Sequence, residues 1–191
     1  VAAQAVASDA ADMDAFMAEA WNADSSKTVK DALVEKIAVI GENLNIRRFQ
    51  KETQENGCIV SYIHGGGRIG VLVKAETAVV NDAVKEALTN VAMQVAALAP
   101  KYVSSEDVSE EYKEHEKAIL LAQAKNENPD KPENIIEKMI IGRLNKELKE
   151  VCLMEQAYVK AEDGKQTVAK YLQQVSKEVG ADIKITGFVR F

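Results

Sequence analysis

Residues 58–75, CIVSYIHGGGRIGVLVKA, contain two β-prone runs separated by three consecutive glycines. From Ile69 onward every second residue of the second run is apolar, a period of two that is typical of a half-buried strand. Glycine adopts positive φ without steric cost, so 65–67 favours a tight turn between antiparallel strands. The stretch therefore predicts a β-hairpin. The run NLNIRRFQ at 43–50 is predicted to be the preceding strand of an antiparallel meander.

The same glycines also match two enzyme motifs. Gly65, Gly67 and Gly70 spell G-x-G-x-x-G, and the HGGG that begins at His64 occurs in some lipases and esterases. A dinucleotide site needs a helix directly after its glycines, whereas a period-two run follows here. The chain lacks the G-x-S-x-G of an esterase, and no Lys-Ser or Lys-Thr pair follows the glycines as in a P-loop. A small-molecule enzyme stays an alternative that requires a helix after Gly70 or a polar pocket beside His64.

The composition argues against several functional classes. With 30 acidic against 24 basic residues, the net charge of -6 disfavours an extended contact with nucleic acid phosphates. Cys58 and Cys152 have no second Cys or His at a metal-ligand spacing, so we expect reduced core thiols, no metal and no cofactor. No apolar run approaches the roughly 20 residues of a membrane span, and the first residues lack a signal-peptide pattern. These features predict a soluble, cytoplasmic protein without catalytic residues, whose partner is a protein or a small ligand.

Amphipathic helices are predicted on both sides of the strands. Two of them are joined by the Pro-containing segment NENPDKPEN into an αα-hairpin. Their wide polar faces and narrow apolar seams are typical of a projecting, coiled-coil-like arm that contacts other molecules. Helices are expected over 11–21, 28–41, 81–98, 109–125, 135–148 and 166–179, and further strands over 150–160 and 182–191.

The order of these elements predicts two related halves. LNIRRF and ITGFVRF are both β-prone, both follow an amphipathic helix and both end in Arg-Phe. We predict an α+β fold of two subdomains, each with a small antiparallel sheet packed on helices, with the helical hairpin inserted between them. The expected domains are core subdomain N at 1–104, the helical hairpin or dimerisation insertion at 105–149, and core subdomain C at 150–191.

Five stretches together resemble one known family across nearly the whole chain. They are KIAVIGENLNIRRF (36–49), YIHGGGRIGVLV (62–73), VAMQVAALAPKYVSSEDV (91–108), KPENIIEKMIIGRLNKELKEVCLMEQAYVK (131–160) and ITGFVRF (185–191). In this order they resemble bacterial elongation factor Ts, the guanine nucleotide exchange factor of elongation factor Tu. The resemblance implies two α+β core subdomains and a helical-hairpin insertion, which agrees with the organisation predicted from the residues.

The resemblance also implies a function. The expected partner is elongation factor Tu, in its GDP-bound and nucleotide-free forms, and the expected activity is promotion of GDP release without covalent chemistry. Such a factor is not an enzyme and acts allosterically, because it binds the nucleotide-free partner better than the nucleotide-bound one. The alternative is a binding or dimerisation scaffold without exchange activity. No membrane contact and no direct nucleic acid contact are expected.

The implied contact residues fall in two segments. The family's strand-turn that touches the nucleotide-binding domain of elongation factor Tu corresponds here to His64, Gly65, Gly66 and Arg68. The contact with the third domain of elongation factor Tu corresponds to Val159 and Lys160, although Lys160 replaces what can be an apolar residue. The arm, roughly 109–148, resembles the region that mediates homodimerisation or accessory contacts in relatives.

Two parts of the family pattern are missing from this sequence. Family members begin with a three-helix domain followed by a T-D-F-V-A segment, whose Asp and Phe loosen GDP, and neither occurs here. The family also continues beyond the position of Phe191. We therefore expect a core truncated at both ends, with impaired exchange activity.

Overall fold

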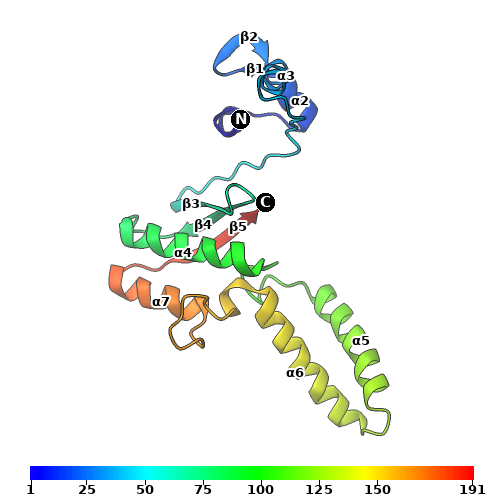
Figure 1. Ribbon diagram of the computed structural model, residues 1–191. Coiled ribbons are helices and arrows are strands. Elements are labelled where there is room, and N and C mark those ends of the chain that lie inside the picture. The colour runs from blue at the N-terminus through cyan, green and yellow to red at the C-terminus, as the bar shows by residue number, and fades with distance from the viewer. The chain divides into compact units, whose positions relative to one another are not determined.

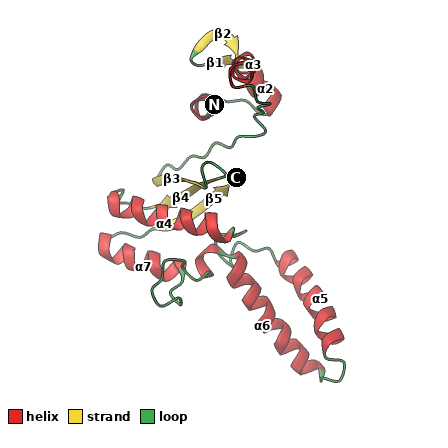
Figure 2. Ribbon diagram, in the orientation of Figure 1, coloured by secondary structure: helices red, strands yellow, loops and turns green.

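The computed structural model describes all 191 residues, which form two compact units, residues 1–53 and 54–191 (Figure 1). Seven α-helices accompany one two-stranded and one three-stranded sheet, both antiparallel (Figure 2). The predicted α+β class with two small antiparallel sheets is confirmed. No helix is both long enough and apolar enough to cross a bilayer. Each unit is described by itself below.

Unit 1 folds around a small core. Its elements are α1 (Ala2–Ala7), α2 (Met13–Ala18), β1 (Ala20–Trp21), β2 (Asp24–Thr28) and α3 (Val29–Ile40). The buried residues Phe16 and Val29 form the centre of this core. The helix expected over 11–21 is shorter than predicted, because the chain turns into the β1–β2 hairpin directly after α2.

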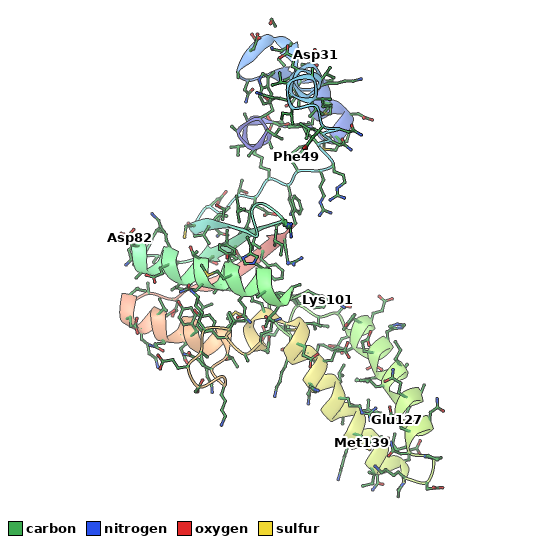
Figure 3. The ribbon with its side chains drawn as sticks, viewed as in Figure 1. Asp31, Phe49, Asp82, Lys101, Glu127 and Met139 are labelled. Carbon is green, nitrogen blue, oxygen red and sulfur yellow. The ribbon has the colours of Figure 1, made fainter.

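The start of α3 is fixed by reciprocal hydrogen bonds. The Asp31 N–H donates to Thr28 Oγ1 at 3.1 Å, and the Thr28 N–H donates to Asp31 Oδ2 at 2.9 Å. These bonds satisfy two backbone N–H groups that have no partner within the first helical turn. Asp31 is labelled in Figure 3. Gly41, with φ of +77°, then ends the helix. The helix predicted over 28–41 is confirmed.

The strand predicted over 43–50 is wrong. Residues 43–53 have no regular secondary structure, although each is described. The Phe49 ring lies 4.5 Å from the Phe16 ring, centroid to centroid, and Ile46 also packs on the unit 1 core (Figure 3). The apolar residues of 43–50 therefore anchor an irregular segment to the unit 1 core. They made the run look β-prone because β-propensity mainly measures how well a side chain packs, and such packing does not require a strand.

Unit 2 contains the predicted hairpin. Strands β3 (Gly57–His64) and β4 (Ile69–Glu76) pair antiparallel, with His64 opposite Ile69 next to the turn. The third strand of this sheet is β5 (Lys184–Arg190), which pairs with β4 on its other side, so the order is β3-β4-β5. The strand predicted at the end of the chain is confirmed, but it pairs with β4, whereas the predicted meander placed 43–50 beside β3.

Two helices cover the core of unit 2. Helix α4 (Asp82–Leu98) packs on the sheet, and α7 (Val168–Val179) packs against α4 (Figures 1 and 2). The Val84 N–H donates to the Asn81 side chain at the start of α4. Both helices were predicted, and their apolar stripes are buried as expected, including Val84, Leu88, Val91, Val95, Val168, Leu172 and Val175.

The arm is an antiparallel pair of helices, α5 (Glu110–Glu127) and α6 (Glu133–Val151), as predicted (Figure 2). Its seam is narrow, with Ala124, Ile136 and Ile140 buried. At its base, the Leu153 N–H donates to the Tyr102 carbonyl at 2.9 Å, so the two chain segments entering and leaving the arm are hydrogen-bonded to each other.

The strand predicted over 150–160 is wrong. The end of α6 leads into a single 3-10 turn, η1 (Leu153–Glu155), followed by a loop that makes only isolated bridges. In this loop the Ala157 carbonyl and the Val159 N–H pair with the buried side chain of Gln94, and the Tyr158 N–H donates to the Gln166 carbonyl. The expected limits of the domains, at 104/105 and 149/150, stay predictions; in unit 2, β5 and α7 share one core with β3, β4 and α4.

Alkaline pH is expected to weaken the base of the arm through Tyr112. Burial raises the pKa of Tyr112 to about 12, and its hydroxyl also donates to Glu147 Oε1 at 3.1 Å. Because the raised pKa favours the neutral phenol in the folded state, this contribution is complete below pH 10 and is lost as the pH rises through about 12. Urea unfolding followed by circular dichroism at pH 9 and at pH 12 should show a larger loss for the parent than for Tyr112→Phe. Equal losses in the two proteins would contradict the assignment.

Candidate partner-binding site

The tip of the β3–β4 hairpin is shaped by its glycines. Gly65, Gly66 and Gly67 have φ of +60°, +67° and +95°, so the predicted positive-φ turn is confirmed. The Arg68 N–H donates to the His64 carbonyl at 3.1 Å and closes the turn. All five residues are exposed. An extended strand follows from Ile69, which excludes the helix that a dinucleotide site would need after Gly70.

His64 is held by a neighbour on the same strand. Its Nδ1 shares a hydrogen bond of 2.9 Å with the Tyr62 hydroxyl, and the two ring centroids lie 5.9 Å apart. Tyr62 itself packs against the core of unit 2. The exposed imidazole is therefore tethered through one nitrogen, and its Nε2 makes no hydrogen bond within the chain, so it is available to another molecule.

Val159 and Lys160 lie in the loop between η1 and α7. Both side chains are exposed, while the preceding Tyr158 is buried and stacks on Tyr171 with ring centroids 4.2 Å apart and an interplanar angle of 15°. Burial raises the pKa of Tyr158 well above its ordinary value, so the phenol is neutral at physiological pH. The loop thus has a buried aromatic anchor directly before its two exposed residues.

An open hollow of about 950 Å³ lies beside this loop. Three lysines, Lys160, Lys165 and Lys170, contribute to its wall, together with the Tyr158 and Tyr171 side chains. Glu162 and Asp163 lie on the same wall, so the surface is polar and carries charges of both signs. Such a surface suits a polar contact with a protein better than an apolar ligand.

The structure places the six predicted residues in two separate groups. His64, Gly65, Gly66 and Arg68 share the hairpin tip, and Val159 and Lys160 share the loop before α7. No hydrogen bond, ion pair or ring contact joins the two groups. Both belong to unit 2, so one compact unit carries both groups of predicted contact residues.

Sequence analysis missed the residues that hold the second group in place. Gln94 and Asn90, on α4, hydrogen-bond to the loop at Val159 and Lys160. The signal was present, because two amides stand one turn apart in a helix whose neighbouring positions are apolar. What each amide would contact could not be predicted, since its partners lie more than 60 residues away along the chain.

Comparison with known proteins identifies the family. The family model described as "Elongation factor TS" matches residues 1–191. Elongation factor Ts of Clostridium botulinum (strain ATCC 19397 / Type A) is 47% identical over 188 residues, which cover 98% of this chain and 60% of the relative. Elongation factor Ts of Clostridium perfringens (strain 13 / Type A) is 49% identical over 168 residues, 88% of this chain and 54% of the relative. The chain thus spans a little over half the length of these relatives. It belongs to the elongation factor Ts family.

Proposed function

We propose that this chain binds elongation factor Tu and promotes the release of its GDP. Membership of the elongation factor Ts family over the whole chain is the observation that carries the proposal. The factor acts without covalent chemistry: it binds the nucleotide-free partner more tightly, and by linkage the nucleotide then binds that partner more weakly. Lowering the nucleotide's affinity about 10³-fold requires about 4 kcal/mol of differential binding.

The two groups of exposed residues are the proposed contacts. At the hairpin tip, the free Nε2 of His64 and the exposed cation of Arg68 supply polar contacts, and the glycines let a partner approach the backbone closely. In the second group, Val159 offers an apolar contact and Lys160 a cation. Because loops on a rigid scaffold commonly carry recognition residues, both positions suit this role. A translation factor of this kind acts in the cytoplasm, which is the proposed location.

The second candidate is a binding scaffold without exchange activity, in which the arm forms a homodimer or an accessory contact. Exposed aliphatic side chains on the arm favour it: Ile119 on α5 and Ile135 and Ile141 on α6. They are not among the residues that form the buried seam between the two helices. Dimerisation through the arm would make sedimentation depend on concentration, and Ile141→Lys would abolish that dependence.

Release of a fluorescent GDP analogue from elongation factor Tu distinguishes the two candidates. Increasing amounts of the chain should accelerate release, while the affinity is measured separately by titration. Acceleration supports the exchange activity. Binding without acceleration supports the scaffold. The absence of binding contradicts the exchange activity and any scaffold that docks on elongation factor Tu, whereas the homodimer is tested by sedimentation.

His64→Ala is expected to weaken binding of elongation factor Tu about tenfold, the loss of about 1.4 kcal/mol that one central polar contact supplies. The melting temperature should stay unchanged because the side chain is exposed. Ser61→Ala is a matched control, since Ser61 is exposed on the same strand but on its opposite face. Unchanged affinity of His64→Ala would show that the tip is an ordinary turn.

A further inference from the structure

Gln94 is fully buried in the middle of α4, a helix that otherwise presents apolar residues to the core. Burying an amide is unfavourable unless its hydrogen bonds are replaced. Here all of them are directed at one loop. Gln94 Oε1 accepts from the Val159 N–H at 2.8 Å, and Nε2 donates to the Ala157 carbonyl and to Gln156 Oε1, both at 3.0 Å. A single side chain thus pairs with three groups of residues 156–159.

Gln156 extends this arrangement to two other elements. It is also buried, and its Nε2 donates to the Glu150 carbonyl near the end of α6 at 2.7 Å. Its own carbonyl accepts from the Val168 N–H at the start of α7 at 3.1 Å. The two glutamines therefore join α4 to both ends of the segment between the arm and α7.

Asn90 holds the next part of the loop. It lies one helical turn before Gln94, on the same side of α4. Its Oδ1 accepts from Lys160 Nζ at 2.7 Å, and its Nδ2 donates to the Tyr171 hydroxyl at 2.9 Å. Tyr171 in turn stacks on Tyr158. The Lys160 side chain and the aromatic anchor of the loop are thereby tied to one asparagine.

We propose that Gln94 and Asn90 are positioning residues, which hold residues 157–160 in the conformation that presents Val159 and Lys160 to a partner protein. The inference rests on the proposed function, since it assigns these two exposed residues to the contact with elongation factor Tu. A loop that is already ordered loses little conformational entropy when it binds, so its contacts contribute more to affinity.

An apolar residue at position 94 would suit the core as well as glutamine does. It would leave the Val159 N–H and the Ala157 carbonyl without their partner, and the loop would lose its defined conformation. Glutamine is therefore favoured at position 94 because the loop needs its hydrogen bonds, and not because the core needs its shape. This distinguishes a positioning role from a purely structural one.

Amide hydrogen exchange tests the clamp without any partner. The Val159 amide should exchange at least tenfold faster in Gln94→Met than in the parent, because methionine matches the shape of glutamine but accepts no comparable hydrogen bond. Val91→Ala is the matched control: it removes fully buried atoms from the same helix but no hydrogen bond to the loop. Equal exchange of the Val159 amide in Gln94→Met and the parent would overturn the proposal.

Affinity for elongation factor Tu tests the role of the clamp. Gln94→Met should bind about tenfold more weakly than the parent, and Val91→Ala should bind as the parent does below its melting temperature. In a background that already carries Val159→Ala and Lys160→Ala, adding Gln94→Met should cost no further affinity, since the residue acts through those two. A full additional loss in that background would overturn the proposal.

Asn90→Ala provides a second variant in case Gln94→Met fails to fold. Asn90 is only half-buried, so its removal should leave the fold intact while freeing Lys160, and binding should again weaken. Unchanged binding of Asn90→Ala would overturn the role assigned to Asn90. If the parent chain does not bind elongation factor Tu, the proposed function fails and the positioning role fails with it, whereas the exchange rates still establish whether the clamp exists.

Discussion

Gly57→Ala is expected to destabilise unit 2 by about 3 kcal/mol or more. Gly57 begins β3 with φ of +139°, and a Cβ atom there would overlap the carbonyl oxygen of Ala75 on the neighbouring strand. The obstacle is the backbone of the central strand, which can move away only by opening the β3–β4 pairing at this end. Urea unfolding followed by far-ultraviolet circular dichroism should show the loss.

Gly66→Ala separates the steric clash from the cost of the backbone conformation. Gly66 also has positive φ, but a Cβ atom there meets nothing within 4 Å. Only the conformational penalty remains, about 1 kcal/mol. Similar losses for the two variants would show that the close approach of Gly57 to Ala75 contributes nothing, and would contradict the prediction.

Phe16→Ala is expected to unfold unit 1 selectively, at a cost of about 3–5 kcal/mol. Phe16 is fully buried, and only Ala5 and Val29 accompany it as buried members of that core. A core this small depends for its stability on its one large fully buried side chain. Trp21, the only tryptophan of the chain, lies in unit 1 and packs against the same core, so its fluorescence reports on that unit alone.

Phe49→Ala is the companion variant. It removes the ring that contacts Phe16 from an irregular segment, so a smaller loss is expected, and the double variant should lose less than the sum of the two because the aromatic pair is already broken. A loss for Phe16→Ala below about 1 kcal/mol, a value typical of surface positions, would show that the unit 1 core does not depend on this ring.

The local features of the fold were predictable, and the long-range pairing was not. The alternation after Ile69 and the three glycines specified the β3–β4 hairpin, because both signals act over a few residues. Two β-prone runs, 43–50 beside β3 and the one now seen as β5 beside β4, were possible third strands of this sheet. Sequence proximity favoured the first, yet β4 pairs with β5, a choice decided by packing between distant residues.

The candidate site was likewise predictable only in part. Family resemblance located the exposed residues, such as His64 and Lys160, because they lie in recognisable segments. The segment 150–160 was misassigned as a strand because it is rich in apolar residues, although Tyr158 is an anchor in a loop. The Val159 N–H of this loop donates to the side chain of Gln94, and no local sequence pattern predicts a hydrogen bond between residues so far apart.

The pairing of β4 with β5 also has a consequence for how unit 2 folds. Closing this sheet pairs residues more than 100 positions apart, from Glu76 with Lys184 to Val71 with Arg190, and the chain entropy lost in such a closure makes the step slow. The arm lies inside that loop, and its helices join only near neighbours in the sequence. Once the Leu153 N–H has donated to the Tyr102 carbonyl, the two ends of the arm are held together. The loop that remains to be closed between β4 and β5 is then effectively shorter. We therefore expect the arm to form first and to shorten the search by which the last strand finds its place.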